Sequence, residues 1–152
     1  MIDELYSERI LTLAANMPRA GRLAHPDGSA ERIAKLCGSR VTVDVALDGD
    51  RVADFAQEVK ACALGQASAA ILGAHVVGAT VAELQLARDA LSAMLKADGP
   101  APQGRFSDLV VLEPVKAYPA RHASTLLAFE AVLAAVREAQ ATTSRTSLAV
   151  AG

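Results

Sequence analysis

The chain has 152 residues, of which 52% are hydrophobic and 21% are charged, and its net charge is −2. This length and composition predict one globular domain that buries its core without disulfides or a structural metal. The near-neutral charge, without a basic stripe interleaved with aromatics, argues against a nucleic-acid surface, and no run of about 18 apolar residues offers a membrane span.

The first predicted element is an amphipathic helix over residues 2–17, which Pro18 ends. Asp3 and Glu4 occupy positions where a signal peptide would carry basic residues, so we expect a cytoplasmic protein. Residues 18–38 contain two prolines and three glycines without a clear apolar period. This segment is predicted to be irregular and to carry the chain from helix to sheet.

A β-hairpin over residues 41–59 is predicted next. Apolar residues occupy every second position of its first strand, on one face: Val41, Val43, Val45 and Leu47. Gly49 can adopt the positive φ of a tight turn. The return strand departs from strict alternation, which predicts a bulge near Ala53 or Asp54. Alternation of this kind means that helices cover one face of an antiparallel sheet.

Three helices are predicted after the hairpin. The first covers residues 63–77, and the second opens at a capping box formed by Thr80 and Glu83. The third runs from about His122 to Gln140, and residues 141–152 are predicted to form a flexible tail. We therefore expect one α+β domain over residues 1–140, with a small antiparallel sheet of about three strands.

The two cysteines flank the predicted hairpin. Cys37 precedes its first strand and Cys62 follows its second, so the two thiols are expected to lie near each other. Cys62 also precedes a helix, whose N-terminus stabilises a thiolate. A second interpretation stays open, in which both cysteines are small buried apolar residues. Two thiolates do not complete a tetrahedral metal site, which needs further donors.

The remaining titratable residues offer few candidates for metal ligands or catalytic groups. His25 and His75 are expected to be ordinary loop or helix residues, whereas His122 opens the last helix. There is no phosphate-binding glycine loop, no GxSxG elbow and no HExxH motif, so no enzyme class is supported. Several carboxylates are expected to face solvent or turns: Asp44, Asp48, Asp50 and Glu83.

Four segments carry a family resemblance: LYSERI with PRAGRL, CGSRVTVDVALDGDRVADF, CALGQAS and YPARHASTLLAFEAV. In this order and spacing they resemble the scaffold proteins of iron–sulfur cluster assembly, the IscU, SufU and NifU N-terminal family, most closely its SufU-like branch. The resemblance spans about residues 4–137. It implies a binding protein rather than an enzyme, with an iron–sulfur cluster or an iron or zinc ion as cargo. Its implied partners are a cysteine desulfurase and iron–sulfur acceptor proteins.

Two ligand positions of the family carry serine in this sequence. The family's aspartate two residues after the first cysteine is Ser39 here, and its third cysteine is Ser124, or Ala123 if the match slides by one residue. A serine hydroxyl ionises far less readily than a thiol and is a poorer ligand. The resemblance implies Cys37 and Cys62 as metal ligands with His122 as an extra donor. Arg121 is a partner-binding residue or an ordinary surface residue.

Three functions follow from these observations. The one we favour is a scaffold that binds iron, zinc or a labile cluster through Cys37 and Cys62. The second is a sulfur-transfer accessory that accepts a persulfide on Cys62. The third is an interaction protein that keeps the scaffold fold without metal chemistry.

Overall fold

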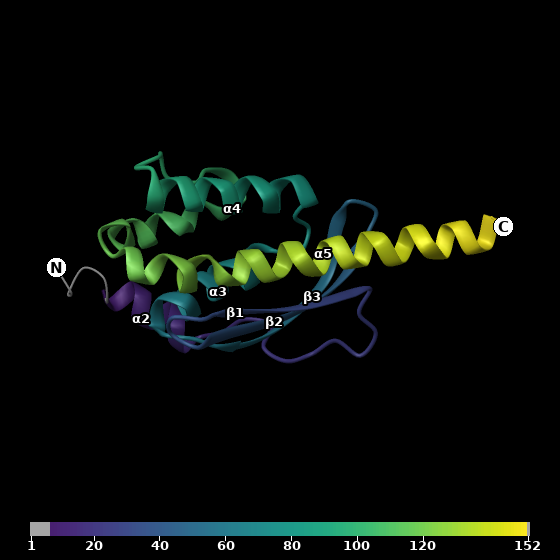
Figure 1. The fold of residues 1–152 in the computed structure, drawn as a ribbon, viewed down its shortest axis with the longest axis horizontal. Coiled ribbons are helices and arrows are strands. Elements are labelled where there is room, and N and C mark those ends of the chain that lie inside the picture. Colours follow the sequence, from purple (N-terminus) through teal and green to yellow (C-terminus); the bar gives the residue numbers. More distant parts are fainter. Residues whose placement is uncertain (1–6, 152) are drawn as a thin grey trace.

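The chain folds into a three-stranded antiparallel sheet with helices packed on one face (Figure 1). The computed structural model describes residues 7–151, and side chains through residue 142. The strands, in spatial order, are β1 (Gly28–Ala34), β2 (Ser39–Asp48) and β3 (Arg51–Lys60). The helical elements are α2 (Glu8–Ala15), α3 (Ala63–His75), α4 (Val81–Lys96), the 3-10 segments η1 (Gly104–Ala117) and η2 (Pro119–Arg121), and α5 (His122–Ala151). The predicted α+β class and three-stranded sheet are confirmed.

The predicted hairpin is formed by β2 and β3. Val41, Val43 and Val45 of the first strand are at most 1% exposed, as the alternation predicts, and Val59 of the return strand is partly buried. Gly49 has φ 62° in the connecting turn. Ala46 pairs with Asp54, whereas Leu47 pairs with Val52, so Ala53 is left over as the bulged residue. The prediction of a bulge near Ala53 or Asp54 is therefore confirmed.

Strand β1 was not expected, because residues 18–38 show no clear period. It forms antiparallel to β2, with Gly28 opposite Val45 and Ala34 opposite Ser39. The backbone pairing with β2 and the packing of α5 stabilise this strand, and neither depends on alternation within β1 itself. As a consequence, Cys37 lies in the β1–β2 turn rather than in an irregular leader.

The carboxylate of Asp44 is fully buried, so the expectation that it faces solvent was wrong. Asp44 alternates with the core valines of β2 and therefore points away from the helices. The guanidinium of Arg22 donates to its two oxygens at 2.7 and 2.9 Å, and Ser29 Oγ donates at 2.6 Å. The backbone N–H of Leu23 adds a fourth hydrogen bond at 3.0 Å. These bonds fasten the segment before β1 onto the face of the sheet opposite the helices.

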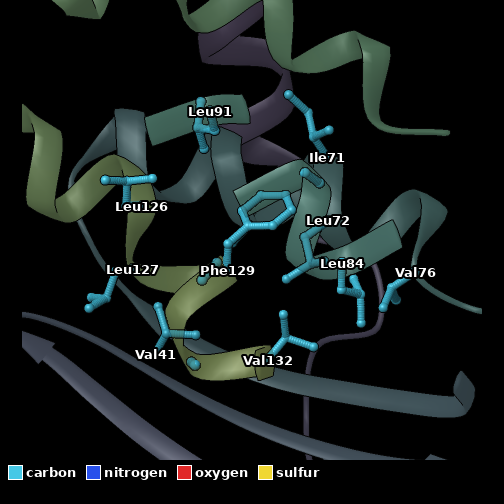
Figure 2. Close-up of a cluster of buried hydrophobic side chains, with 14 of the residues drawn as sticks. Val41, Ile71, Leu72, Val76, Leu84, Leu91, Leu126, Leu127, Phe129 and Val132 are labelled. Atoms are coloured by element: carbon cyan, nitrogen blue, oxygen red, sulfur yellow. The ribbon is translucent and has the colours of Figure 1, made fainter. Parts of the chain in front are cut away.

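Helix α5 lies along β1 and β2 and is sandwiched between the sheet and α4 (Figure 1). Phe129 of α5 is fully buried and meets Phe106 of η1 edge to face, with ring centroids 5.7 Å apart. Figure 2 shows its ring among the aliphatic side chains of α3, α4 and α5. The hydrophobic core therefore lies between the sheet and these helices.

The helix predicted over residues 2–17 is observed as α2, which begins at Glu8 and ends at Ala15, and residues 2–6 of that prediction lie outside the described part of the chain. The helix predicted over residues 63–77 is α3, which ends at His75. The Thr80–Glu83 capping box is present at the start of α4, with both reciprocal hydrogen bonds at 3.0 Å. Helix α5 continues to Ala151 instead of ending near Gln140, because no glycine or proline interrupts the sequence between them. Within the described part of the chain, no helix is long and apolar enough to cross a lipid bilayer.

Candidate metal centre

One end of the sheet gathers the two thiols and two serine hydroxyls. Cys37 is in the β1–β2 turn, Cys62 is the N-cap residue of α3, and Ser124 is in the first turn of α5. The Cys62 Sγ and Ser124 Oγ atoms are 3.5 Å apart, and the Cys37 Sγ and Ser39 Oγ atoms are 3.0 Å apart. Ser124 also lies near enough to the Cys37 thiol to contribute to the lowering of its pKa. The hairpin thus places both cysteines at this end of the sheet, each beside a serine hydroxyl.

Hydrogen bonding favours the thiolate form of Cys37. Bonds from the Ser39 side chain and backbone lower the pKa of the Cys37 thiol below its ordinary value of 9.0, against a smaller opposing effect of burial. Ser124 adds a further lowering contribution. A larger thiolate fraction at neutral pH makes a cysteine a better metal ligand and a better nucleophile.

The turn and the helix start leave both sulfurs available. Gly38, with φ 71°, closes the β1–β2 turn through a hydrogen bond from its N–H to the Ala34 carbonyl at 2.8 Å. Cys62 caps α3 without a side-chain hydrogen bond to the first turn. Cys37 is exposed and Cys62 is partly buried, and both are free thiols. The interpretation that both cysteines are buried apolar residues was therefore wrong for Cys37.

His122 does not join the cysteines. Its side chain is buried, and its Nε2 atom lies 3.0 Å from the backbone carbonyl of Val115 in η1. Over the described residues, no three His, Cys, Asp or Glu side chains gather where they could hold a metal ion. His122 instead fastens the start of α5 to η1. The side chain of Arg121 makes no hydrogen bond or ion pair within the described part of the chain, while its carbonyl accepts hydrogen bonds from Ser124 and Thr125.

Gly65 is a site residue that we did not predict from the sequence. A Cβ atom added at Gly65 would lie 2.8 Å from the Cβ of Ala61 and 3.1 Å from the Ser124 carbonyl oxygen. Only a glycine lets α3 approach the first turn of α5 this closely. The run of small residues around it in the sequence was the available signal, but a close approach between two helices cannot be read from one of them.

We expect Gly65→Ala to disturb the cluster more than it destabilises the fold. The added methyl group pushes the Ser124 backbone away from α3 and lengthens the contact between Ser124 Oγ and Cys62 Sγ. Overpacking of this kind costs about 1–3 kcal/mol. Thiol reactivity at neutral pH, measured with a chromogenic disulfide, should change relative to wild type. Ala74→Gly, at an exposed position of the same helix, should leave it unchanged, and equal rates in Gly65→Ala and wild type would contradict the expectation.

The fold and the thiol cluster together define a small α+β domain that carries two cysteines at one end of its sheet. The family model for the NifU-like N-terminal domain matches residues 5–143. The chain therefore belongs to the NifU-like N-terminal domain family of iron–sulfur cluster assembly scaffolds, and the resemblance seen in the sequence is confirmed.

Known proteins similar to this chain agree with that membership. The chain is 25% identical over 134 residues to the iron–sulfur cluster assembly scaffold protein IscU of Thermotoga maritima, covering 88% of this chain and 94% of the relative. A solved nitrogen-fixing NifU-like protein (N-terminal) from Brucella abortus is 55% identical, with a TM-score of 0.90 over 91% of this chain and 96% of that one. A putative iron–sulfur cluster assembly scaffold protein for the SUF system from Fervidobacterium islandicum shares the fold, at 24% identity and a TM-score of 0.80 over 88% of this chain and 97% of that one.

Proposed function

We propose that this chain is a binding scaffold, not an enzyme, that holds iron, zinc or a labile iron–sulfur cluster through the thiolates of Cys37 and Cys62. The observation that supports this proposal is that two free thiols lie at one end of the sheet, each within hydrogen-bond distance of a serine hydroxyl: Cys37 of Ser39 and Cys62 of Ser124. The metal or cluster is cargo. A cysteine desulfurase would supply its sulfur, and acceptor proteins would receive it.

The donor set supports a labile rather than a tightly held cargo. Thiolates are strong ligands for iron–sulfur clusters and zinc, whereas a neutral hydroxyl is a weak one. Ser39 lies within hydrogen-bond distance of the Cys37 sulfur and favours its thiolate, and the Ser124 hydroxyl donates to the Arg121 carbonyl, so neither serine replaces a thiolate as a strong ligand. A site with two strong ligands per chain releases its metal more readily than a site with four.

Sulfur acceptance on Cys62 has less support than metal binding. A persulfide donor must bring its sulfur within bonding distance of the attacking thiolate. Cys62 is partly buried beside Ser124, whereas Cys37 is exposed. The two thiols therefore fit the binding of one metal or cluster by both cysteines better than the formation of a persulfide on Cys62.

The test is the metal content of protein purified without oxygen and reconstituted with iron and sulfide. We expect bound iron or zinc in the wild type and at least about a 10-fold weaker affinity in Cys37→Ser and Cys62→Ser. His25→Ala, which removes an exposed histidine from the segment before β1, should bind like the wild type. Thermal unfolding followed by circular dichroism should show all three variants folded. Wild-type protein without metal above background would contradict the proposal.

A further inference from the structure

A groove of about 360 Å³ lies between α4 and the chain segment that runs into η1. Its walls are mostly apolar, formed by Leu86, Ala87, Ala90, Pro102 and Phe106. Phe106 is 2% exposed and Ala87 is 6% exposed, so the groove reaches down to the hydrophobic core. Its volume falls within the range of about 300–1,000 Å³ that is typical of binding pockets in proteins.

The charged groups that line the groove are already paired, so the groove suits an uncharged occupant. Arg105 Nε donates to Glu83 Oε2 at 3.0 Å, and both Nη atoms of Arg105 donate to backbone carbonyls at and just after the end of α3. The other carboxylate oxygen of Glu83 accepts from the Thr80 N–H in the capping box. A charged ligand would have to displace these bonds, whereas an apolar group leaves them in place.

The side chain of Leu86 lines this groove and is itself 68% exposed. Ala82 and Ala90 lie four residues before and after it, so one ridge of α4 carries a small, a large and a small side chain in turn. Ala90 also lines the groove. The same patch therefore presents an exposed apolar side chain and an apolar hollow next to it, a combination typical of interaction surfaces.

We propose that two copies of this chain pair through this patch, with Leu86 of each copy seated in the groove of the other. A twofold interface uses the same patch on both copies, so that patch must be complementary to itself. If the axis passes beside residue 88 of two antiparallel α4 helices, Leu86 of one copy meets Ala90 of the other, and the reverse. Each leucine then fills the space beside an alanine, and it is uncharged, as the paired groups around the groove require.

The charges on α4 agree with this antiparallel pairing. With the axis beside residue 88, Glu83 and Asp89 of one copy both lie opposite alanines of the other, so no like charges face each other there. Arg88 lies at the axis but is turned to α5, where its Nε donates to Glu130 at 2.8 Å. The facing surfaces are therefore electrostatically neutral.

The pairing surface is remote from the two thiols. Arg105 donates to the carbonyl of His75, the last residue of α3, whereas Cys62 caps the first turn of that helix. The 13 residues of α3 span about 20 Å. Helix α4 also lies on the side of α5 away from the sheet (Figure 1). Both thiol sites thus stay accessible in the dimer, and this inference does not depend on the proposed function.

The test is sedimentation equilibrium of the full metal-free chain under reducing conditions, from micromolar to millimolar concentration. One helix face and one short segment make a small interface, so we expect a weak dimer that forms as the concentration rises. Leu86→Asp should weaken dimerisation by about 10-fold or more, because it puts a carboxylate into a groove whose arginine is already bonded. Leu11→Asp, at an exposed leucine of α2, is the matched control and should leave it unchanged.

An exchange of the two facing side chains tests the geometry of the pair. Leu86→Ala leaves the groove unfilled and Ala90→Leu makes two leucines collide, so each alone should weaken dimerisation by about 5-fold or more. The double variant with Leu86→Ala and Ala90→Leu again sets a leucine opposite an alanine, so it should dimerise within about 2-fold of the wild type. Circular dichroism should show every variant folded.

The inference would be overturned by a chain that is monomeric at every concentration, by a dimer that Leu86→Asp leaves intact, or by a double variant no stronger than the single ones. An apolar fluorescent dye that binds a monomeric wild type but not Leu86→Asp would assign the groove to a small apolar ligand instead. The metal content of reconstituted Leu86→Asp should equal that of the wild type, so the dimer and the proposed function fail or hold separately. A lower content would contradict the separation of the two surfaces.

Discussion

Asp44→Ala is expected to lower the free energy of unfolding at pH 7 by about 3 kcal/mol, since it removes a fully buried carboxylate and all of its hydrogen bonds. The variant leaves the Leu23 N–H and the Ser29 hydroxyl without their acceptor. It also releases Arg22, which is half exposed and returns to water at little cost. The segment before β1 then loses the bonds that hold it against the sheet. Urea unfolding followed by circular dichroism measures the difference.

The effect of Asp44 should depend on pH. Burial alone would raise the pKa of this carboxyl, but hydrogen bonds from Arg22, Ser29 and Leu23 outweigh it and hold the pKa below its ordinary value of 3.8. A group with a lowered folded-state pKa stabilises the fold above its unfolded-state pKa and loses that contribution as the pH falls through the folded value. The difference between wild type and Asp44→Ala should therefore be full at pH 7 and shrink below about pH 3.8.

The matched control for Asp44→Ala is Asp48→Ala. Asp48 ends the same strand at the exposed turn and makes no side-chain hydrogen bond or ion pair within the described residues. Its replacement should change the free energy of unfolding by less than about 0.5 kcal/mol at any pH. Equal effects of the two substitutions would show that the Asp44 hydrogen bonds contribute nothing beyond an ordinary surface charge.

Gly28→Ala is expected to be the most damaging small substitution in the sheet, lowering the free energy of unfolding by about 3 kcal/mol or more. A Cβ atom at this position would meet the Ala135 carbonyl oxygen and would lie 2.5 Å from the Ala139 nitrogen. Both atoms belong to the backbone of α5, so no side chain can rotate to make room. Either β1 or α5 must move.

A displaced α5 would also reach the thiol cluster, because the same helix carries Ser124. We therefore expect Gly28→Ala to lower both the midpoint of thermal unfolding and the metal content of the reconstituted protein. Glu31→Ala, at an exposed position of β1, is the control and should change stability by less than about 0.5 kcal/mol. If Gly28→Ala were as stable as the wild type, the close approach of β1 to the backbone of α5 would not limit the size of the side chain at this position.

Parts of the fold with their own local signal could be predicted. Valines at every second position predict the hairpin, and the break in that alternation predicts its bulge. The capping box of α4 needs only Thr80 and Glu83, three residues apart. In each case the residues that make the structure are neighbours in the sequence, so the pattern and its cause coincide.

The features that the sequence patterns did not predict depend on contacts between segments far apart in the sequence. Strand β1 exists because β2 pairs with it, and Asp44 is buried because Arg22 and Leu23 fold over it. His122 has the position of a ligand in the sequence, yet η1 provides a carbonyl that holds its ring. None of these contacts has a local period that a sequence pattern could reveal.

By itself, then, the sequence determined a hairpin with one cysteine at each outer end and a helix that begins with serine and threonine side chains. Only the tertiary structure decided that Ser124, 62 residues after Cys62, lies beside both thiols and that His122 does not. The physical reason is that antiparallel pairing fixes where a strand's ends go, whereas the direction of a side chain at a helix start is set by whatever packs against that helix.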